Sequence, residues 1–98
     1  MEITFKSKKL EKICRNAHFA TKHYGFEMAE KIQQRMSEIE AASSVEMMVR
    51  FNLGRCHPLN GNRKNQYAVD LVHPFRLIFI KKGEEIQVAI IQEIVDYH

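Results

Sequence analysis

The sequence has no apolar run approaching the roughly 20 residues needed to cross a bilayer. Its first residues, MEITFKSKKL, lack the apolar core of a secretory signal, so we expect a cytoplasmic protein that does not enter the membrane. It also lacks internal repeats, low-complexity tracts and linkers. Because 98 residues allow only one modest core, we expect a single domain over residues 1–98.

Cysteine pairs and metal-ligand spacings are also missing. Cys14 and Cys56 form no CxxC pair, which favours reduced thiols over a disulfide framework. Cys56, His57, His73 and His98 are possible zinc ligands, but no two of them are separated by two to four residues. We therefore expect no metal and no cofactor.

The positive charge is concentrated in one part of the chain. The net charge of +3 divides into +1 over residues 1–49, +6 over residues 50–82 and −4 over residues 83–98. A concentrated basic segment favours binding to the phosphate backbone of a nucleic acid, although such a segment is often only a charged surface exposed to solvent.

The first half of the chain predicts one strand and a helical hairpin. Alternation over residues 2–6 predicts a short strand, after which Ser7 caps a helix. Apolar residues recur at helical spacing as far as Tyr24, and Gly25 ends that helix. A second helix carries an apolar stripe over residues 28–39.

Next comes a short helical turn. Ser43 and Glu46 fit a capping box at its start, and the turn would cover residues 45–49.

The second half predicts three strands. Alternation over residues 66–71, a break at His73-Pro74, a strand over 75–80, a turn at 82–84 and a strand over 86–97 describe an antiparallel meander. The predicted fold class is α+β: an N-terminal strand and a two-helix hairpin packed on one face of a mainly antiparallel sheet. The other face would stay open for a ligand.

An arginine interrupts the otherwise apolar strand 75–80. Ionised arginine is rarely fully buried, so Arg76 requires a partner carboxylate or an anionic ligand above the sheet. Asp70 and Asp96 are the possible carboxylates. Strand alternation puts Asp96 and His98 on one side and Tyr97 on the other, unless a bulge intervenes, for which Gln92 is the candidate.

Four segments resemble the RelE/ParE superfamily of toxins from type II toxin-antitoxin systems, and most closely its HigB-like branch. They are EITFKSKKLEKI, the H-x-L-x-G loop that begins at His57, QYAVDLVHPFRLIF, and the terminal IVDYH. The resemblance spans essentially the whole chain. It implies a small α+β fold that enters the ribosomal A site and cuts mRNA there.

Metal-independent RNA cleavage needs the 2′-hydroxyl deprotonated, the phosphate stabilised and the 5′-oxygen protonated. Arg76 resembles the strand arginine of the family and would clamp the phosphate, because its guanidinium is a planar fork that stays charged. His57 and His98 are the acid-base candidates, because imidazole titrates near neutral pH. Asp96 resembles the acid that accompanies the terminal histidine and would orient it.

The other candidates would bind substrate. Tyr97 either stacks on an mRNA base or packs against the helices, and strand alternation leaves both open. HigB-type loops often carry a lysine where this sequence has Asn60, which cannot neutralise a phosphate. Arg63 and Lys64 could replace that lysine, or, together with Arg55, they could bind ribosomal RNA instead.

The resemblance also implies partners: a HigA-like antitoxin protein, the ribosome and mRNA, with operator DNA reached only through the antitoxin. Two other functions fit the same fold. One is a ParE-type gyrase poison, which needs no acid-base set, and the other is a non-catalytic module that binds RNA or protein. His57 and the terminal Asp96-Tyr97-His98 argue against the gyrase poison.

Overall fold

Residues 1–97, the part that this computed structural model describes, form a five-stranded sheet in the order β1-β5-β4-β3-β2. The strands are β1 (Glu2–Phe5), β2 (His57–Pro58), β3 (Gln66–Asp70), β4 (Phe75–Lys82) and β5 (Val88–Asp96). β1 runs parallel to β5, and the other neighbours are antiparallel. The expected α+β class and the three-strand meander are confirmed.

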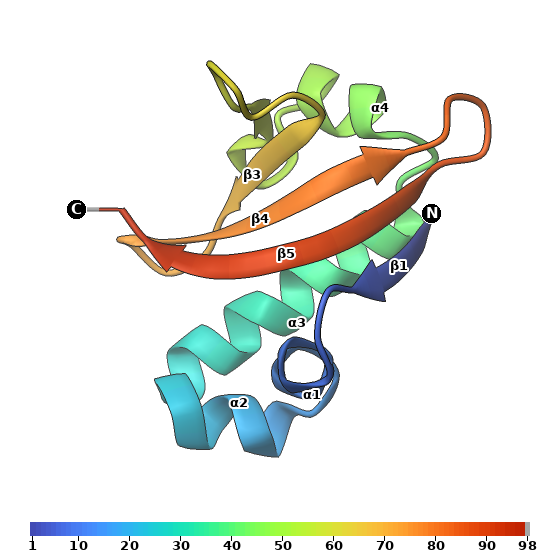
Figure 1. Cartoon of the computed structure of the whole chain (residues 1–98). Helices are drawn as coiled ribbons and strands as arrows, with labels where there is room; N and C mark the ends of the chain where they lie inside the picture. Colours follow the sequence, from blue (N-terminus) through green and yellow to red (C-terminus); the bar gives the residue numbers. More distant parts are fainter. Residues whose placement is uncertain (98) are drawn as a thin grey trace.

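Three helices lie together on one side of the sheet (Figure 1): α1 (Lys8–Arg15), α2 (Ala17–Tyr24) and α3 (Phe26–Ala41). Helix α4 (Val45–Arg50) and the 3₁₀ helix η1 (Leu53–Arg55) lead into β2. In the core, Leu77, Phe79 and Ile91 of the sheet belong to the same buried cluster as Ile32 and Met36 of α3. We call this side of the sheet the helix face and the opposite side the site face. In residues 1–97 no helix is both long and apolar enough to span a membrane.

Two details of the predicted helices are wrong. The continuous helix ending at Tyr24 is broken at Asn16, whose extended backbone ends α1 and whose side chain accepts a hydrogen bond from Phe19 N at 3.1 Å to begin α2. The cap of α4 is Ser44 rather than Ser43, since Ser44 Oγ accepts from Met47 N at 3.0 Å. In both cases a polar side chain satisfies a free N–H at the start of a helix.

The pairing of β4 with β5 contains a bulge. Ile78 pairs with Glu93 while Phe79 pairs with Ile91, so Gln92 is the extra residue on β5. The sequence-based prediction of a bulge at Gln92 is confirmed. Because one extra residue reverses the alternation of a strand, the bulge determines which residues of the β5 end reach the site face.

Gln87 connects α4 to the turn between β4 and β5. Its buried amide accepts a hydrogen bond from Val45 N at 2.8 Å and donates to Glu46 Oε1 at 2.7 Å and to the Glu84 carbonyl at 2.9 Å. It therefore satisfies a free N–H of α4 and ties that helix to the sheet.

Replacing Gln87 by Met keeps the length of the side chain but removes all three hydrogen bonds. We expect the free energy of unfolding to fall by about 1–3 kcal/mol, because a buried N–H loses its acceptor. Urea unfolding measures this change. Gln34→Met is the control, since Gln34 is exposed, and an equal loss in both variants would contradict the role of Gln87.

Glu46 carries a charge that the fold stabilises. Hydrogen bonds from Gln87 and from Lys81 lower the pKa of its carboxyl from 4.5 to about 2. The Lys81 Nζ–Glu46 Oε2 distance is 2.8 Å, and Lys81 also lies 3.4 Å from Glu84.

The lowered pKa of Glu46 predicts a pH-dependent stability. The ionised carboxylate stabilises the fold above pH 4.5, and this stabilisation is lost as the pH falls towards about 2, because the unfolded chain binds a proton more readily. Thermal melts between pH 6 and 2.5 should show a smaller acid-induced drop in Tm for Glu46→Gln than for wild type. Parallel curves would show that Glu46 does not contribute.

Candidate RNA-binding and catalytic site

Arg76 lies on the site face beside a carboxylate. Asp70 on β3 pairs directly with Arg76 on β4, and Arg76 Nε is 3.6 Å from Asp70 Oδ1. Asp70 Oδ2 is 3.2 Å from Arg55 Nε, so one carboxylate lies between two guanidinium groups. Asp70 Oδ1 is buried and accepts no hydrogen bond within residues 1–97, although the Arg76 guanidinium lies beside it. Asp70, one of the two acids considered from sequence, is thus in contact with Arg76.

The end of β5 lies beside Arg76. Arg76 pairs with Val95, and its guanidinium carbon is 4.8 Å from the centre of the Tyr97 ring. Tyr97 N donates to the Pro74 carbonyl at 3.0 Å, which ties the last described residue to the β3–β4 turn. The alternative in which Tyr97 packs against the helices is wrong, because the bulge puts its ring on the site face.

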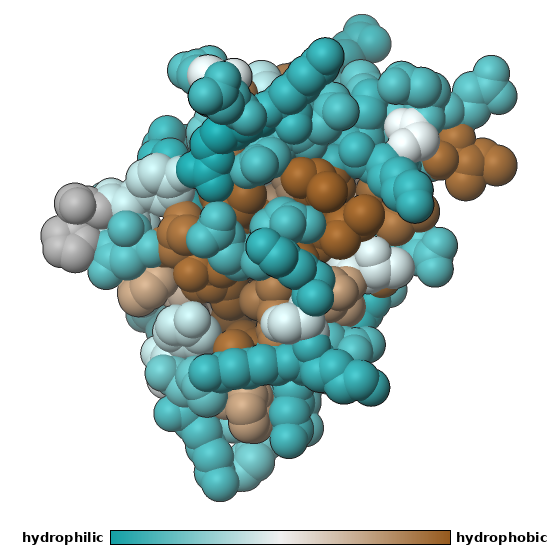
Figure 2. Space-filling model, in the orientation of Figure 1, coloured by the Kyte–Doolittle hydropathy of each residue, from teal (hydrophilic) through white to brown (hydrophobic). Residues whose placement is uncertain are grey.

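Arg63 reaches across the site face from the loop before β3. It donates to Gln66 Oε1 at 3.0 Å, to the Tyr97 hydroxyl at 3.3 Å and to Glu93 Oε2 at 3.3 Å. Ile78, which lies on this face, is fully buried. The site face is therefore less open than the sequence suggested, because long polar side chains lie across its apolar strand residues. The surrounding hydrophobic side chains can be seen over β4 and β5 in Figure 2.

His57 belongs to the same face. It pairs with Ala68, so strand alternation directs its ring to the site face, and its Nδ1 is 2.8 Å from the Arg55 carbonyl. A carbonyl only accepts hydrogen bonds, so Nδ1 carries the proton in this contact and Nε2 of the neutral ring is left as an acceptor. His57 lies two strands from β4, about 10 Å across the sheet, and is level with Ile78, two residues along the strand from Arg76.

The remaining predicted residues are less closely grouped. Asp96 pairs with Phe75, which places it on the side of the sheet opposite Arg76. Lys64 is exposed in the turn before β3. His98 lies outside the described residues. The structure thus brings Arg55, Arg76 and Tyr97 together: Asp70 lies between the two arginines, and the Tyr97 ring lies against Arg76.

Arg35 is a buried residue that contacts the site and that the sequence-based prediction did not include. This α3 residue is almost fully buried; its Nε donates to the Asp70 carbonyl at 2.6 Å and its Nη1 pairs with Glu38 at 2.9 Å. Its position, three residues after Ile32 on the apolar stripe of α3, was the available signal, because a charge on a buried stripe needs a partner. The pairing of Asp70 with Arg55 and that of Glu93 with Arg63 join different elements of the fold, and the sequence carried no signal for either.

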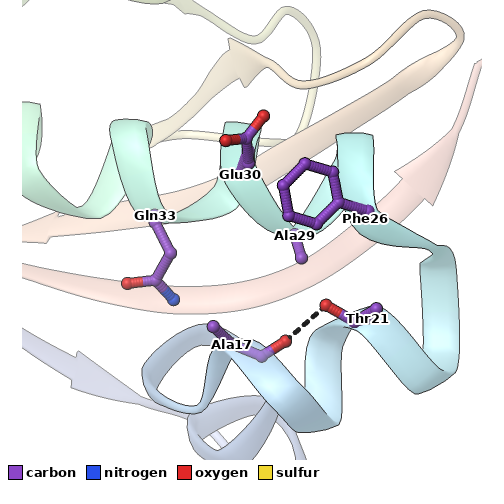
Figure 3. A pocket seen from close by; sticks show the side chains of 6 residues that line it. All are labelled: Ala17, Thr21, Phe26, Ala29, Glu30 and Gln33. Carbon is purple, nitrogen blue, oxygen red and sulfur yellow. Dashed lines mark hydrogen bonds between the residues drawn. The ribbon is translucent and has the colours of Figure 1, made fainter.

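Other hollows and reactive groups lie elsewhere. A groove of about 320 Å³ between α2 and α3 is lined by Ala17, Thr21, Phe26, Ala29, Glu30 and Gln33, and by none of the predicted site residues (Figure 3).

Burial raises the pKa of both Cys14 and Cys56 to about 12, as expected for unreactive thiols. Within residues 1–97 no group of three or more His, Cys, Asp or Glu side chains is arranged to hold a metal ion.

The element order and the sheet topology define a RelE/ParE-like toxin fold. Among solved structures, a YoeB/ParE toxin from Agrobacterium tumefaciens is similar, with a TM-score of 0.66, 14% sequence identity and coverage of 100% of both chains. No protein-family model and no curated protein matches the sequence. The fold implied by the resemblance is confirmed, whereas this comparison does not single out the HigB-like branch.

Asp70 should contribute more to stability than the exposed carboxylate of Glu93. Asp70→Asn leaves two guanidinium groups without their acid in a partly buried position, so we expect a loss of about 1–2 kcal/mol in the free energy of unfolding. Glu93→Gln breaks one pair whose side chains are 40% and 48% exposed, and should cost less than about 1 kcal/mol. Urea unfolding at low and high salt compares them, and equal losses would contradict a shared role for Asp70.

Proposed function

We propose that this protein is a ribosome-dependent mRNA endoribonuclease that acts as the toxin of a toxin-antitoxin system. The observation that carries the proposal is the register of β4 with its two neighbours: pairing with β5 sets Arg76 beside Tyr97, and pairing with β3 sets it beside Asp70. The RelE/ParE-like fold supports it. Cutting mRNA in the ribosomal A site would inhibit translation.

Arg76 is the proposed phosphate clamp. Its side chain is 30% exposed, and its Nε is directed towards Asp70. A guanidinium held in this way can offer its terminal nitrogens to two phosphate oxygens and stabilise the charge that develops in the transition state. Asp70 and the Tyr97 ring would keep the fork in place before substrate arrives.

His57 and His98 are the proposed acid-base pair. The contact with the Arg55 carbonyl leaves His57 Nε2 able to accept a proton, which suits a base that activates the 2′-hydroxyl. His98 would then protonate the 5′-oxygen. Asp96 pairs with Phe75 on the side of the sheet opposite Arg76, so it would orient the His98 ring only from around the end of β5. This route needs no metal ion.

Tyr97 and the basic residues would hold the RNA. One face of the Tyr97 ring is against Arg76, so a base would stack on the other face. Arg63, already bonded to the Tyr97 hydroxyl, would fix that ring, and Lys64 would neutralise phosphate where Asn60 cannot. Arg55 completes the basic surface.

A HigA-like antitoxin is the proposed neutralising partner. The gyrase-directed alternative uses the same fold and predicts arrested growth with intact mRNA. The binding-module alternative predicts RNA binding without turnover. Translation in vitro with added protein, followed by mapping of mRNA ends with and without ribosomes, separates the three. Arrest of translation while the mRNA stays intact would contradict the nuclease proposal.

Arg76→Ala provides the residue-level test. Loss of one charged group that stabilises the transition state should reduce the cleavage rate by roughly 100- to 1,000-fold, while the protein stays folded in a thermal melt. The matched control is Arg15→Ala, which also removes an arginine from an ion pair with a carboxylate, here with Glu40 at 3.2 Å between α1 and α3. Equal cleavage by both variants would exclude Arg76 from catalysis, and an unfolded Arg76→Ala would favour a structural role.

A further inference from the structure

Arg55 occupies an unusual backbone conformation. Asn52, Gly54 and Arg55 have φ values of 55°, 59° and 54°, in the left-handed region that residues other than glycine seldom adopt. A Cβ on Gly54 would lie 2.7 Å from Arg35 Nε, so only glycine fits against that buried arginine. Strained positions of this kind cluster at functional sites.

The strained segment directs Arg55 to the same carboxylate as Arg76. The two nitrogen–oxygen distances are 3.2 and 3.6 Å, and Arg35 holds the backbone of Asp70 from below at 2.6 Å. The groups come from α3, η1, β3 and β4, so their arrangement is set by the fold rather than by one flexible loop. Two guanidinium groups share one carboxylate, which leaves an excess positive charge.

A small cavity lies beside these groups. It has a volume of about 140 Å³ and is lined by Arg55, Asp70, Leu71, His73, Pro74, Phe75 and Arg76. Small-molecule sites usually begin at about 300 Å³, so this cavity suits a compact group and not a whole nucleoside. The two guanidinium groups select an anion.

We propose that this cavity is a second phosphate subsite, which binds the phosphodiester adjacent to the one at Arg76 in single-stranded RNA. The proposal rests on the proposed function, because it takes RNA as the ligand. Arg55 is the main contact and Asp70 is a positioning residue that keeps the two guanidinium groups side by side. His73 lies in the wall of the cavity.

The test uses RNA that cannot be cleaved. A 2′-O-methyl RNA tetranucleotide is titrated into the full chain and followed by NMR, whose spectra also report folding, between 50 and 200 mM salt. Arg55→Gln should weaken binding roughly tenfold for any base sequence and lower the salt slope by about 0.7, the value for one contact to a single strand. Arg15→Gln, the control, should match wild type.

A methylphosphonate scan then locates the contact. Neutralising one phosphate at a time should identify a position that weakens binding to wild type but has little further effect on Arg55→Gln. Equal affinities and salt slopes for Arg55→Gln and Arg15→Gln would overturn the subsite, and so would a scan in which both proteins respond alike. The mRNA-end assay tests cleavage separately, so either proposal can fail while the other holds.

Discussion

The pairing of β4 with β5 is the constraint on which the candidate site depends. Phe79 pairs with Ile91, and the extra residue Gln92 shifts the pairing so that Arg76 meets Val95. Side chains alternate along a strand, so a slip of one residue would send the Tyr97 ring to the helix face. The bulge therefore decides that an aromatic ring lies over the arginine, while Asp96 is directed to the opposite side.

A second consequence is the balance of charge on the site face. Asp70 lies between Arg55 and Arg76, and Glu93 holds Arg63 over the sheet. Acids would weaken a purely electrostatic attraction for RNA, but they also fix the directions of the guanidinium groups before a ligand arrives. Such preorganisation is the main way in which a protein stabilises charge that develops during a reaction. The site face thus combines a modest net charge with ordered donors.

The helix layer contributes to this arrangement from the other side of the sheet. Buried Arg35 reaches from α3 to the Asp70 carbonyl, and only a glycine at position 54 leaves room for it. At the far end, Gln87 joins α4 to the β4–β5 turn. Hydrophobic burial is not directional, so apolar packing alone would not fix how α3 and α4 are placed on the sheet. The hydrogen bonds of Arg35 and Gln87 fix these positions.

The sequence by itself determined the α+β class, the three-strand meander, the bulge at Gln92 and the need for a partner of Arg76, because alternation and burial rules act on neighbouring residues. It predicted one helix where Asn16 makes two, since helical spacing continues across the break. Only the tertiary structure decided that Asp70 is a partner of Arg76, that the Tyr97 ring lies against Arg76 and that Arg35 holds the backbone of Asp70. The Arg35–Asp70 and Arg76–Tyr97 contacts join residues 35 and 21 positions apart in the sequence. The Asp70–Arg76 contact depends on the register of two neighbouring strands, which local sequence patterns do not specify.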